Sequence, residues 1–201
     1  MGNRASAVLV VDAVNEYLGT ESDRAEGGAV VSAAVRVISA ARSTGVHVVH
    51  TRLRFRSDGI DGGHYFRRNP DLAAFAGRTA VAVAPLAETE DELFVPRTYP
   101  SPFFATSLSA TLRGIEADIV ILIGATTSEG IRAAAIDAMQ HGFDAVVVAD
   151  AVTDPSADQH ARALAELADR YADVVSSDDA VALILSADKS RSADTEDAPW
   201  N

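Results

Sequence analysis

The sequence predicts an α/β fold: a doubly wound, Rossmann-like six-stranded parallel sheet in the order 3-2-1-4-5-6, flanked by helices. Three observations lead to this prediction. The length of 201 residues suits one domain, which we expect to span 1–187. Runs of Val, Ile, Leu and Ala alternate with segments of helical periodicity. These apolar runs are nearly continuous, which is typical of strands that helices cover on both faces.

The first half of the chain begins as a βαβ unit. A strand at 7–14, a helix at about 27–44 and a strand at 46–52 follow one another. Residues 53–93 are rich in loop-forming side chains, and we expect little regular structure there before the next strand at 93–97. The long loop region therefore falls after the second predicted strand.

The second half continues the alternation of strands and helices. Its predicted elements are a helix at 106–114, a strand at 118–124, a helix at 128–141, a strand at 144–149, a helix at 157–170, a strand at 172–176 and a last helix at 177–185. Residues 188–201 mix Asp, Ser and Lys without an apolar period, so we expect a disordered acidic tail.

Charge and composition narrow the range of functions. The net charge of −12 leaves no basic surface for nucleic acid or anionic membranes. No apolar run approaches the roughly 20 residues that a membrane span needs, and the first residues do not resemble a signal peptide. We expect a cytoplasmic protein whose partner is a small molecule.

Cysteine is absent from the chain, and lysine is nearly so. The chain has no cysteine, which excludes disulfides, thiolate metal sites and a cysteine nucleophile. Its single lysine, Lys189, lies in the predicted tail, so every cation of the predicted domain is an arginine.

Motifs for nucleotides and for zinc are absent. The sequence contains neither the dinucleotide motif GxGxxG nor the P-loop motif GxxxxGK[ST], and no pair of histidines has the spacing of a zincin site. We therefore expect neither a cofactor nor a metal.

Chemistry-bearing residues follow three of the predicted strands. Asp12 ends the first strand, Arg97 ends the third, and the fourth runs into a helix through Thr126, Thr127, Ser128, Glu129 and Gly130. In a doubly wound sheet these carboxyl ends meet at the ligand-binding edge. Amides of the first helical turn can bind an anion or oxyanion there. Ser128 fits either a nucleophile or, better, a helix cap. Glu129 fits either a water-activating base or a residue that stabilises the helix start.

Several segments resemble the isochorismatase-like, or cysteine hydrolase, superfamily, and most closely its N-carbamoylsarcosine amidohydrolase branch. They are AVLVVD at 7–12, VPR at 95–97, SPFFATSL at 101–108 and GATTSEGIRAAAIDA at 124–138, with weaker likeness at 61–63, 139–143 and 171–175. The resemblance covers residues 7–185. It implies the fold above, a dimer or tetramer, and a cis peptide bond at Ala125–Thr126.

The resemblance also implies a triad of Asp, Lys and Cys. The Asp falls on Asp12, but the Lys falls on Arg97 and the Cys on Gly130. Isochorismatases in the same superfamily also lack the cysteine and hydrolyse a vinyl ether with the Asp as acid. Arg97 can hold Asp12 but cannot exchange protons. A missing side chain at Gly130 is expected to leave room for a water or a ligand group.

The leading hypothesis is a cysteine-independent hydrolase or acid–base enzyme. It would act on a small polar, carboxylated metabolite in a secondary-metabolite pathway, with Asp12 transferring the proton and Arg97 and Glu129 assisting. Asp12→Asn is then expected to abolish turnover with little change in melting temperature. Two alternatives stay open: a lyase, isomerase or cyclase that uses the same pocket, and a catalytically silent binding protein.

Residues further from the strand ends are candidates for binding substrate. Arg52, Arg54 and Arg56 alternate after the second strand, so they would share one face and bind a carboxylate. His64 and Phe103 are expected to contribute to the pocket wall. An apolar helix surface would permit a homo-oligomer.

Overall fold

The sheet has the predicted topology. The computed structural model describes residues 4–19, 24–77 and 80–196, and in them six strands pair in parallel in the order β3-β2-β1-β4-β5-β6. The strands are β1 (Ser6–Val11), β2 (His47–Leu53), β3 (Leu93–Arg97), β4 (Ile119–Ala125), β5 (Asp144–Thr153) and β6 (Asp173–Val175). Strand order reverses between β1 and β4, which makes this crevice the expected ligand site.

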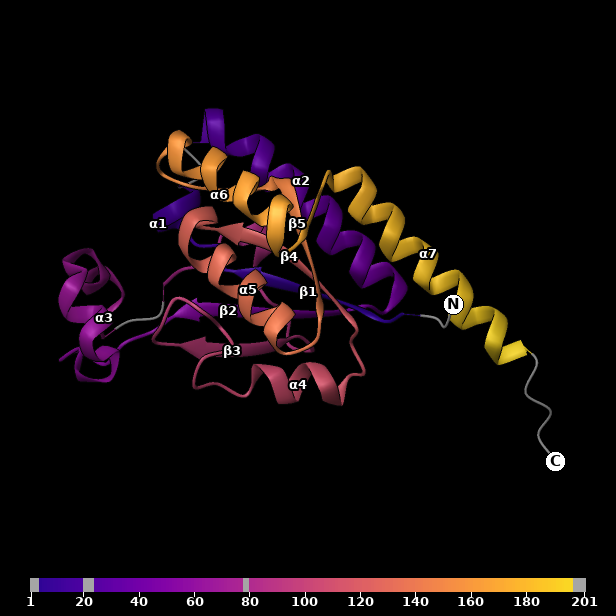
Figure 1. Cartoon of the computed structure of the whole chain (residues 1–201), viewed down its shortest axis with the longest axis horizontal. Coiled ribbons are helices and arrows are strands. Elements are labelled where there is room, and N and C mark those ends of the chain that lie inside the picture. Colours follow the sequence, from indigo (N-terminus) through magenta and orange to yellow (C-terminus); the bar gives the residue numbers. More distant parts are fainter. Residues whose placement is uncertain (1–3, 20–23, 78–79, 197–201) are drawn as a thin grey trace.

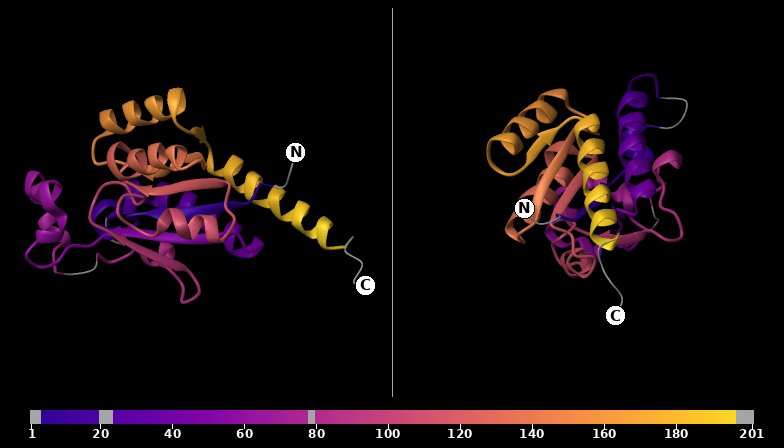
Figure 2. Two further views of the ribbon diagram at one scale, coloured as in Figure 1. Left: turned by 60° about the horizontal axis from the view of Figure 1, so that its bottom comes forward. Right: turned by 90° about the vertical axis from the view of Figure 1, so that its right-hand side faces the viewer.

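Helices cover both faces of the sheet (Figures 1 and 2). The two on one face are α2 (Arg24–Thr44) and α7 (Ser177–Glu196); those on the other face are α4 (Leu108–Gly114), α5 (Arg132–Gln140) and α6 (Ala157–Arg170). Successive residues of β1 belong to the two cores in turn: Val8 packs with α2, and Leu9 packs with α4 and α5. Both faces are buried, which explains why the strand is apolar from Ala7 to Val11.

The last helix is longer than predicted. We expected it to end at 185 and a disordered tail to begin at 188, but α7 continues to Glu196. No glycine or proline occurs between 178 and 198, so nothing in the sequence breaks the helix. Residues 197–201 lie outside the described residues.

The region between β2 and β3 carries short elements that hydrophobic periodicity did not reveal. They are α3 (Gly63–Arg68) and three 3₁₀ turns at Ile60–Gly62, Pro70–Phe75 and Ala84–Leu86. Leu53, Phe55, Leu72 and Phe75 form a small separate core against which α3 packs, whereas Leu86 belongs to the core that contains α2. Figure 1 shows α3 beyond the arrowheads of β2 and β3, at the carboxyl edge of the sheet. None of the described helices is long and apolar enough to span a bilayer.

Candidate active site

The site lies where β1 and β4 end side by side. Asp12 follows β1 in the left-handed region, with φ of 42°. Gly124 of β4 has φ of 117°, and a Cβ atom there would lie 1.9 Å from the carbonyl oxygen of Val11. Only glycine permits this close approach of the two strands. The Ala125–Thr126 peptide bond that follows is cis, as predicted.

Asp12 and Arg97 form a buried ion pair. Arg97 Nη1 donates to Asp12 Oδ1 at 2.8 Å, and Nη2 donates to Oδ2. The side chains are 3% and 1% exposed. The Leu53 amide also donates to Asp12 Oδ1 at 2.9 Å, and Arg97 Nε donates to the Pro100 carbonyl at 3.1 Å. Both carboxylate oxygens are therefore occupied within the protein.

The ion pair fixes the charge of Arg97. Burial alone lowers the pKa of a guanidinium, but the charge and hydrogen bonds of Asp12 outweigh burial and raise the pKa of Arg97 above its ordinary value. Arg97 therefore stays charged and holds the Asp12 carboxylate.

The space beside Gly130 is filled. A Cβ atom there would lie 3.1 Å from Arg97 Nη2, 3.2 Å from the Ala125 carbonyl oxygen and 3.2 Å from Val11 Cγ1. The expectation that the missing side chain leaves room for a water or a ligand group is wrong. The guanidinium of Arg97 thus lies beside the position that a Cβ atom at residue 130 would occupy.

Residues Thr127–Ile131 form one π-helical turn before α5. The Glu129 and Ile131 amides donate to the Thr126 carbonyl at 3.3 and 3.0 Å, and the Ser128 amide donates to Asp154 Oδ2 at 2.8 Å. These three amides hold the turn together. All three therefore have acceptors within the protein.

A cavity of about 240 Å³ lies over this turn. Its lining comes from α1 (Asn15–Leu18), from the region of α3, from the β4–α5 turn and from the start of α6. The lining residues are Tyr17, Tyr65, Asn69, Asp71, Leu72, Thr126, Ser128, Glu129, Asp154, Pro155 and Gln159. Three carboxylates and no arginine or lysine line it, so the cavity is acidic.

Glu129 and Tyr65 are joined inside this cavity. The Tyr65 hydroxyl donates to Glu129 Oε1 at 2.8 Å, although the residues are 64 positions apart. Burial, and then the charge of Glu129 and its hydrogen bond, raise the pKa of Tyr65. Burial, Asp12 and Glu129 raise the pKa of Tyr17 as well. Both phenols therefore stay protonated near neutral pH, and Glu129 remains exposed to the cavity.

The structure separates the predicted site residues into groups. Thr126, Ser128 and Glu129 line the cavity, whereas Asp12, Arg97 and Gly130 are buried and line none of it. The Thr127 side chain is buried and its Oγ1 lies 2.8 Å from His160 Nδ1.

Three other predicted residues lie elsewhere. Phe103 is 5% exposed and stacks on His141 at a centroid distance of 5.3 Å, within the core. His64 is exposed on α3 with Nδ1 3.1 Å from Arg67 Nη2. Arg54 lines a different cavity.

The sequence reasoning missed Tyr17, Asp154 and Gln159. Asp154 directly follows β5, so the rule that pointed to Asp12 could have found it. Tyr17 lies on α1, whose four residues are too few for periodicity to show. Among the described residues no three His, Asp or Glu side chains gather as metal ligands.

Comparison with known proteins agrees with the fold and the resemblance. The chain is 37% identical over 190 residues to a maleamate amidohydrolase from Pseudomonas putida, covering 89% of this chain and 86% of the relative. A cysteine hydrolase from Pseudomonas syringae pv. phaseolicola has the same fold, with a TM-score of 0.84 at 22% identity over 93% of this chain and 95% of that one. An N-carbamoylsarcosine amidase from Thermoplasma acidophilum gives 0.72 at 25% identity, over 87% and 97%.

The match to a family is equally extensive. The isochorismatase domain matches residues 6–179, which contain all six strands and the whole of the site described above. The chain therefore belongs to the isochorismatase family.

Proposed function

We propose that this protein is a cysteine-independent hydrolase in which Glu129 activates the attacking water. The observation that carries the proposal is the Tyr65–Glu129 hydrogen bond of 2.8 Å inside the cavity at the β1–β4 crevice. Glu129 is a carboxylate exposed to this cavity, and Tyr65 fixes one of its oxygens and leaves the other for water. The absence of cysteine from the chain requires such a substitute for the thiol.

In the proposed step, Glu129 takes one proton from a water molecule while the water oxygen bonds to the electrophilic carbon of the substrate. The bond from that carbon to the leaving group breaks, and the leaving group receives the proton from Glu129. The protonated Tyr65 hydroxyl orients the carboxylate throughout. No covalent enzyme intermediate is needed.

Asp12 has a positioning role in this proposal, which changes the assignment made from sequence. Both of its oxygens accept hydrogen bonds, and its side chain is 3% exposed. A carboxylate held in this way is poorly placed to receive a substrate proton. It fixes Arg97, and Arg97 in turn packs against Gly130 at the base of the turn that carries Glu129.

The substrate is proposed to be a small polar molecule whose reacting end is uncharged. The cavity of about 240 Å³ is small, and the carboxylates of Asp71, Glu129 and Asp154 disfavour an anionic group in contact with them. The carboxylate that the sequence favours would have to point out of this cavity. Maleamate, named for a relative, has an amide at one end and a carboxylate at the other, so it is the natural first probe.

The test measures ammonia release from maleamate and from the uncharged diamide of maleic acid in ¹⁸O-labelled water. One ¹⁸O atom per product identifies hydrolysis. Glu129→Gln is expected to lower kcat at least 100-fold, and Tyr65→Phe less. Glu90→Gln, an exposed Glu outside the cavity, is the matched control.

Three other outcomes separate the alternatives. Turnover without ¹⁸O would indicate a lyase, isomerase or cyclase, and binding of either probe without turnover would indicate a silent binding protein. Full activity of Glu129→Gln would contradict the role of Glu129 and favour Asp12 as the residue that transfers the proton. A role in a secondary-metabolite pathway remains part of the proposal.

Two properties of the whole protein belong to the proposal as well. We expect a homo-oligomer, a dimer or tetramer, and the exposed side chains of Phe104, Met139 and Leu185 offer apolar surface for it. Light scattering of the purified protein measures the oligomeric state. The proposed location is the cytoplasm, in keeping with the acidic surface and a small-molecule substrate.

A further inference from the structure

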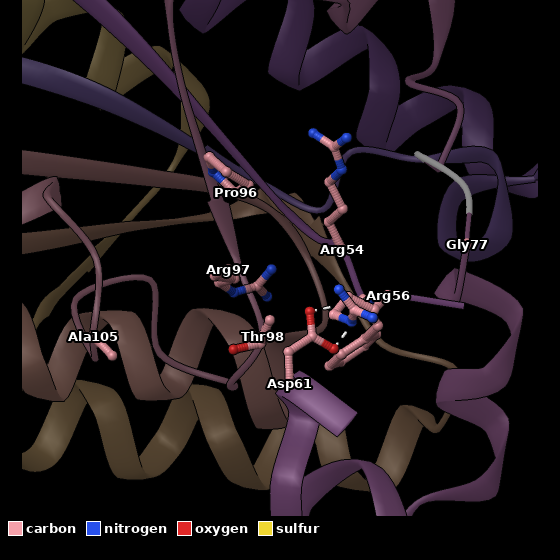
Figure 3. A pocket seen from close by; sticks show the side chains of 9 residues that line it. Arg54, Arg56, Asp61, Gly77, Pro96, Arg97, Thr98 and Ala105 are labelled. Atoms are coloured by element: carbon pink, nitrogen blue, oxygen red, sulfur yellow. Dashed lines mark hydrogen bonds between the residues drawn. The ribbon is translucent and has the colours of Figure 1, made fainter. Parts of the chain in front are cut away.

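A second and larger cavity lies where β2 and β3 end. Its volume is about 590 Å³. The lining residues are Arg54, Phe55, Arg56, Asp61, Gly77, Pro96, Arg97, Thr98 and Ala105 (Figure 3). None of them lines the cavity that contains Glu129, so the two spaces are separate. The proposed function places no substrate in the larger one, although Arg97 lines it.

The charges around this cavity are unusual for so acidic a protein. Three arginines and one aspartate line it. Arg97 is paired with Asp12, and Arg56 donates to both oxygens of Asp58 at 3.2 and 3.1 Å. Arg54 is exposed, and within the described part of the chain its guanidinium has neither a hydrogen-bond acceptor nor an acidic partner.

Arg52, two residues earlier in the chain, differs from Arg54 in having an acidic partner. Arg52 and Arg54 were expected to share one face, but the Arg52 side chain is 7% exposed and forms a two-point pair with Glu88. The backbone of Arg54 is nevertheless fixed, because its amide donates to the Arg97 carbonyl at 2.9 Å. A cation on an anchored backbone therefore stands beside a cavity with its donors unused.

We propose that this cavity binds a small organic carboxylate through Arg54. The planar guanidinium presents two parallel N–H donors that match a carboxylate. The Thr98 hydroxyl offers a further hydrogen bond, and Pro96 and Ala105 offer apolar contact for the remainder of the ligand. Asp61, held by two 3.1 Å contacts from the Arg56 amide, faces the same space and opposes a second negative charge. A monocarboxylate is thus favoured over phosphate.

The experiment is calorimetric titration of the full chain with benzoate, with its uncharged isostere benzamide, and with inorganic phosphate. Benzoate is expected to bind more tightly than either of the others. Arg54→Gln is expected to weaken benzoate binding at least tenfold. Arg67→Gln, which removes an exposed arginine outside the cavity, is the matched control and keeps wild-type affinity.

Equal binding of benzoate and benzamide, or unchanged benzoate binding by Arg54→Gln, would overturn the proposal. Tighter binding of phosphate would overturn the choice of carboxylate. Glu129→Gln is expected to bind benzoate like the wild type. The Glu129 variant thus tests the proposed mechanism and the Arg54 variant tests this site, so either proposal can fail without the other. Arg54 is exposed, so circular dichroism should show an unchanged fold in its variant.

Discussion

At the scale of single residues, the contact between Gly130 and Arg97 can be tested by adding one methyl group. Gly130→Ala places Cβ 3.1 Å from Arg97 Nη2 and 3.2 Å from two further atoms, so we expect a destabilisation of about 1–3 kcal/mol. Arg97→Lys withdraws the guanidinium and so makes room for the new methyl group. The loss of unfolding free energy in the double variant should therefore be smaller than the sum of the losses in the two single variants. Urea unfolding of the three variants measures this coupling, and simple additivity would contradict it.

Asp12→Asn tests the buried ion pair. The sequence predicts a melting temperature within a few degrees of wild type, because Asn is nearly isosteric with Asp. The structure changes this expectation, because the substitution leaves Arg97, with a side chain 1% exposed, without a counter-charge. Removing one partner of a buried pair costs about 3–5 kcal/mol. Thermal unfolding beside the exposed control Asp91→Asn checks the prediction, and equal melting temperatures would show that the pair is not needed for stability.

At the scale of elements, Glu92 joins α2 to the sheet just before β3. Arg42 of α2 donates to its oxygens at 2.8 and 2.9 Å, and His50 of β2 lies 3.0 Å away. Burial raises the pKa of Glu92, but the hydrogen bonds from Arg42, the Thr89 amide and His50 outweigh burial and hold it at about 2. Glu92→Gln should therefore cost about 1.5–3 kcal/mol at pH 7.

The pH dependence of this loss has a definite sign. The folded-state pKa of Glu92 is lowered, so its stabilisation is complete above pH 4.5 and is lost as the pH falls towards about 2. The difference in unfolding free energy between wild type and Glu92→Gln should shrink between pH 5 and pH 2. Urea titrations at several pH values measure it, and a constant difference would assign the loss to packing instead.

The elements also show what sequence patterns can and cannot predict. The continuous apolar run of β4 requires burial on both faces, so the strand and its place in a parallel sheet follow from the sequence. The four residues of α1 and the six of α3 are too short for a helical period, and side chains distant in the sequence hold them. At the candidate site, the strand-end rule predicts Asp12 and Arg97. The Tyr65–Glu129 bond depends on how the long loop folds back, and the filled space at Gly130 depends on atomic packing.

At the scale of the whole molecule, the excess of acidic residues predicts a pH at which the protein loses solubility but stays folded. The net charge of −12 at pH 7 vanishes near the isoelectric point of about 4.7, where electrostatic repulsion between molecules is lowest. The hydrogen bond from Arg52 chiefly lowers the pKa of Glu88 to about 2, and the pKa of Glu92 is also about 2. Both carboxylates therefore stay ionised and keep their partners at pH 4.7. We expect the protein to precipitate near pH 4.7 in folded form and to redissolve at pH 7. Turbidity and circular dichroism test this, and loss of helical signal at pH 4.7 would contradict it.

The fit between Arg97 and Gly130 also limits the order in which this sequence can change. A cysteine introduced at position 130 first would place its Cβ only 3.1 Å from a guanidinium nitrogen, which would have to shift. Shortening Arg97 first would remove one arm of a buried two-point pair and leave a void beside the glycine. Each single step is therefore unfavourable, whereas the two changes together relieve the contact. Evolution, or a directed-evolution experiment, would introduce a thiol here only through a destabilised intermediate or by changing both positions together.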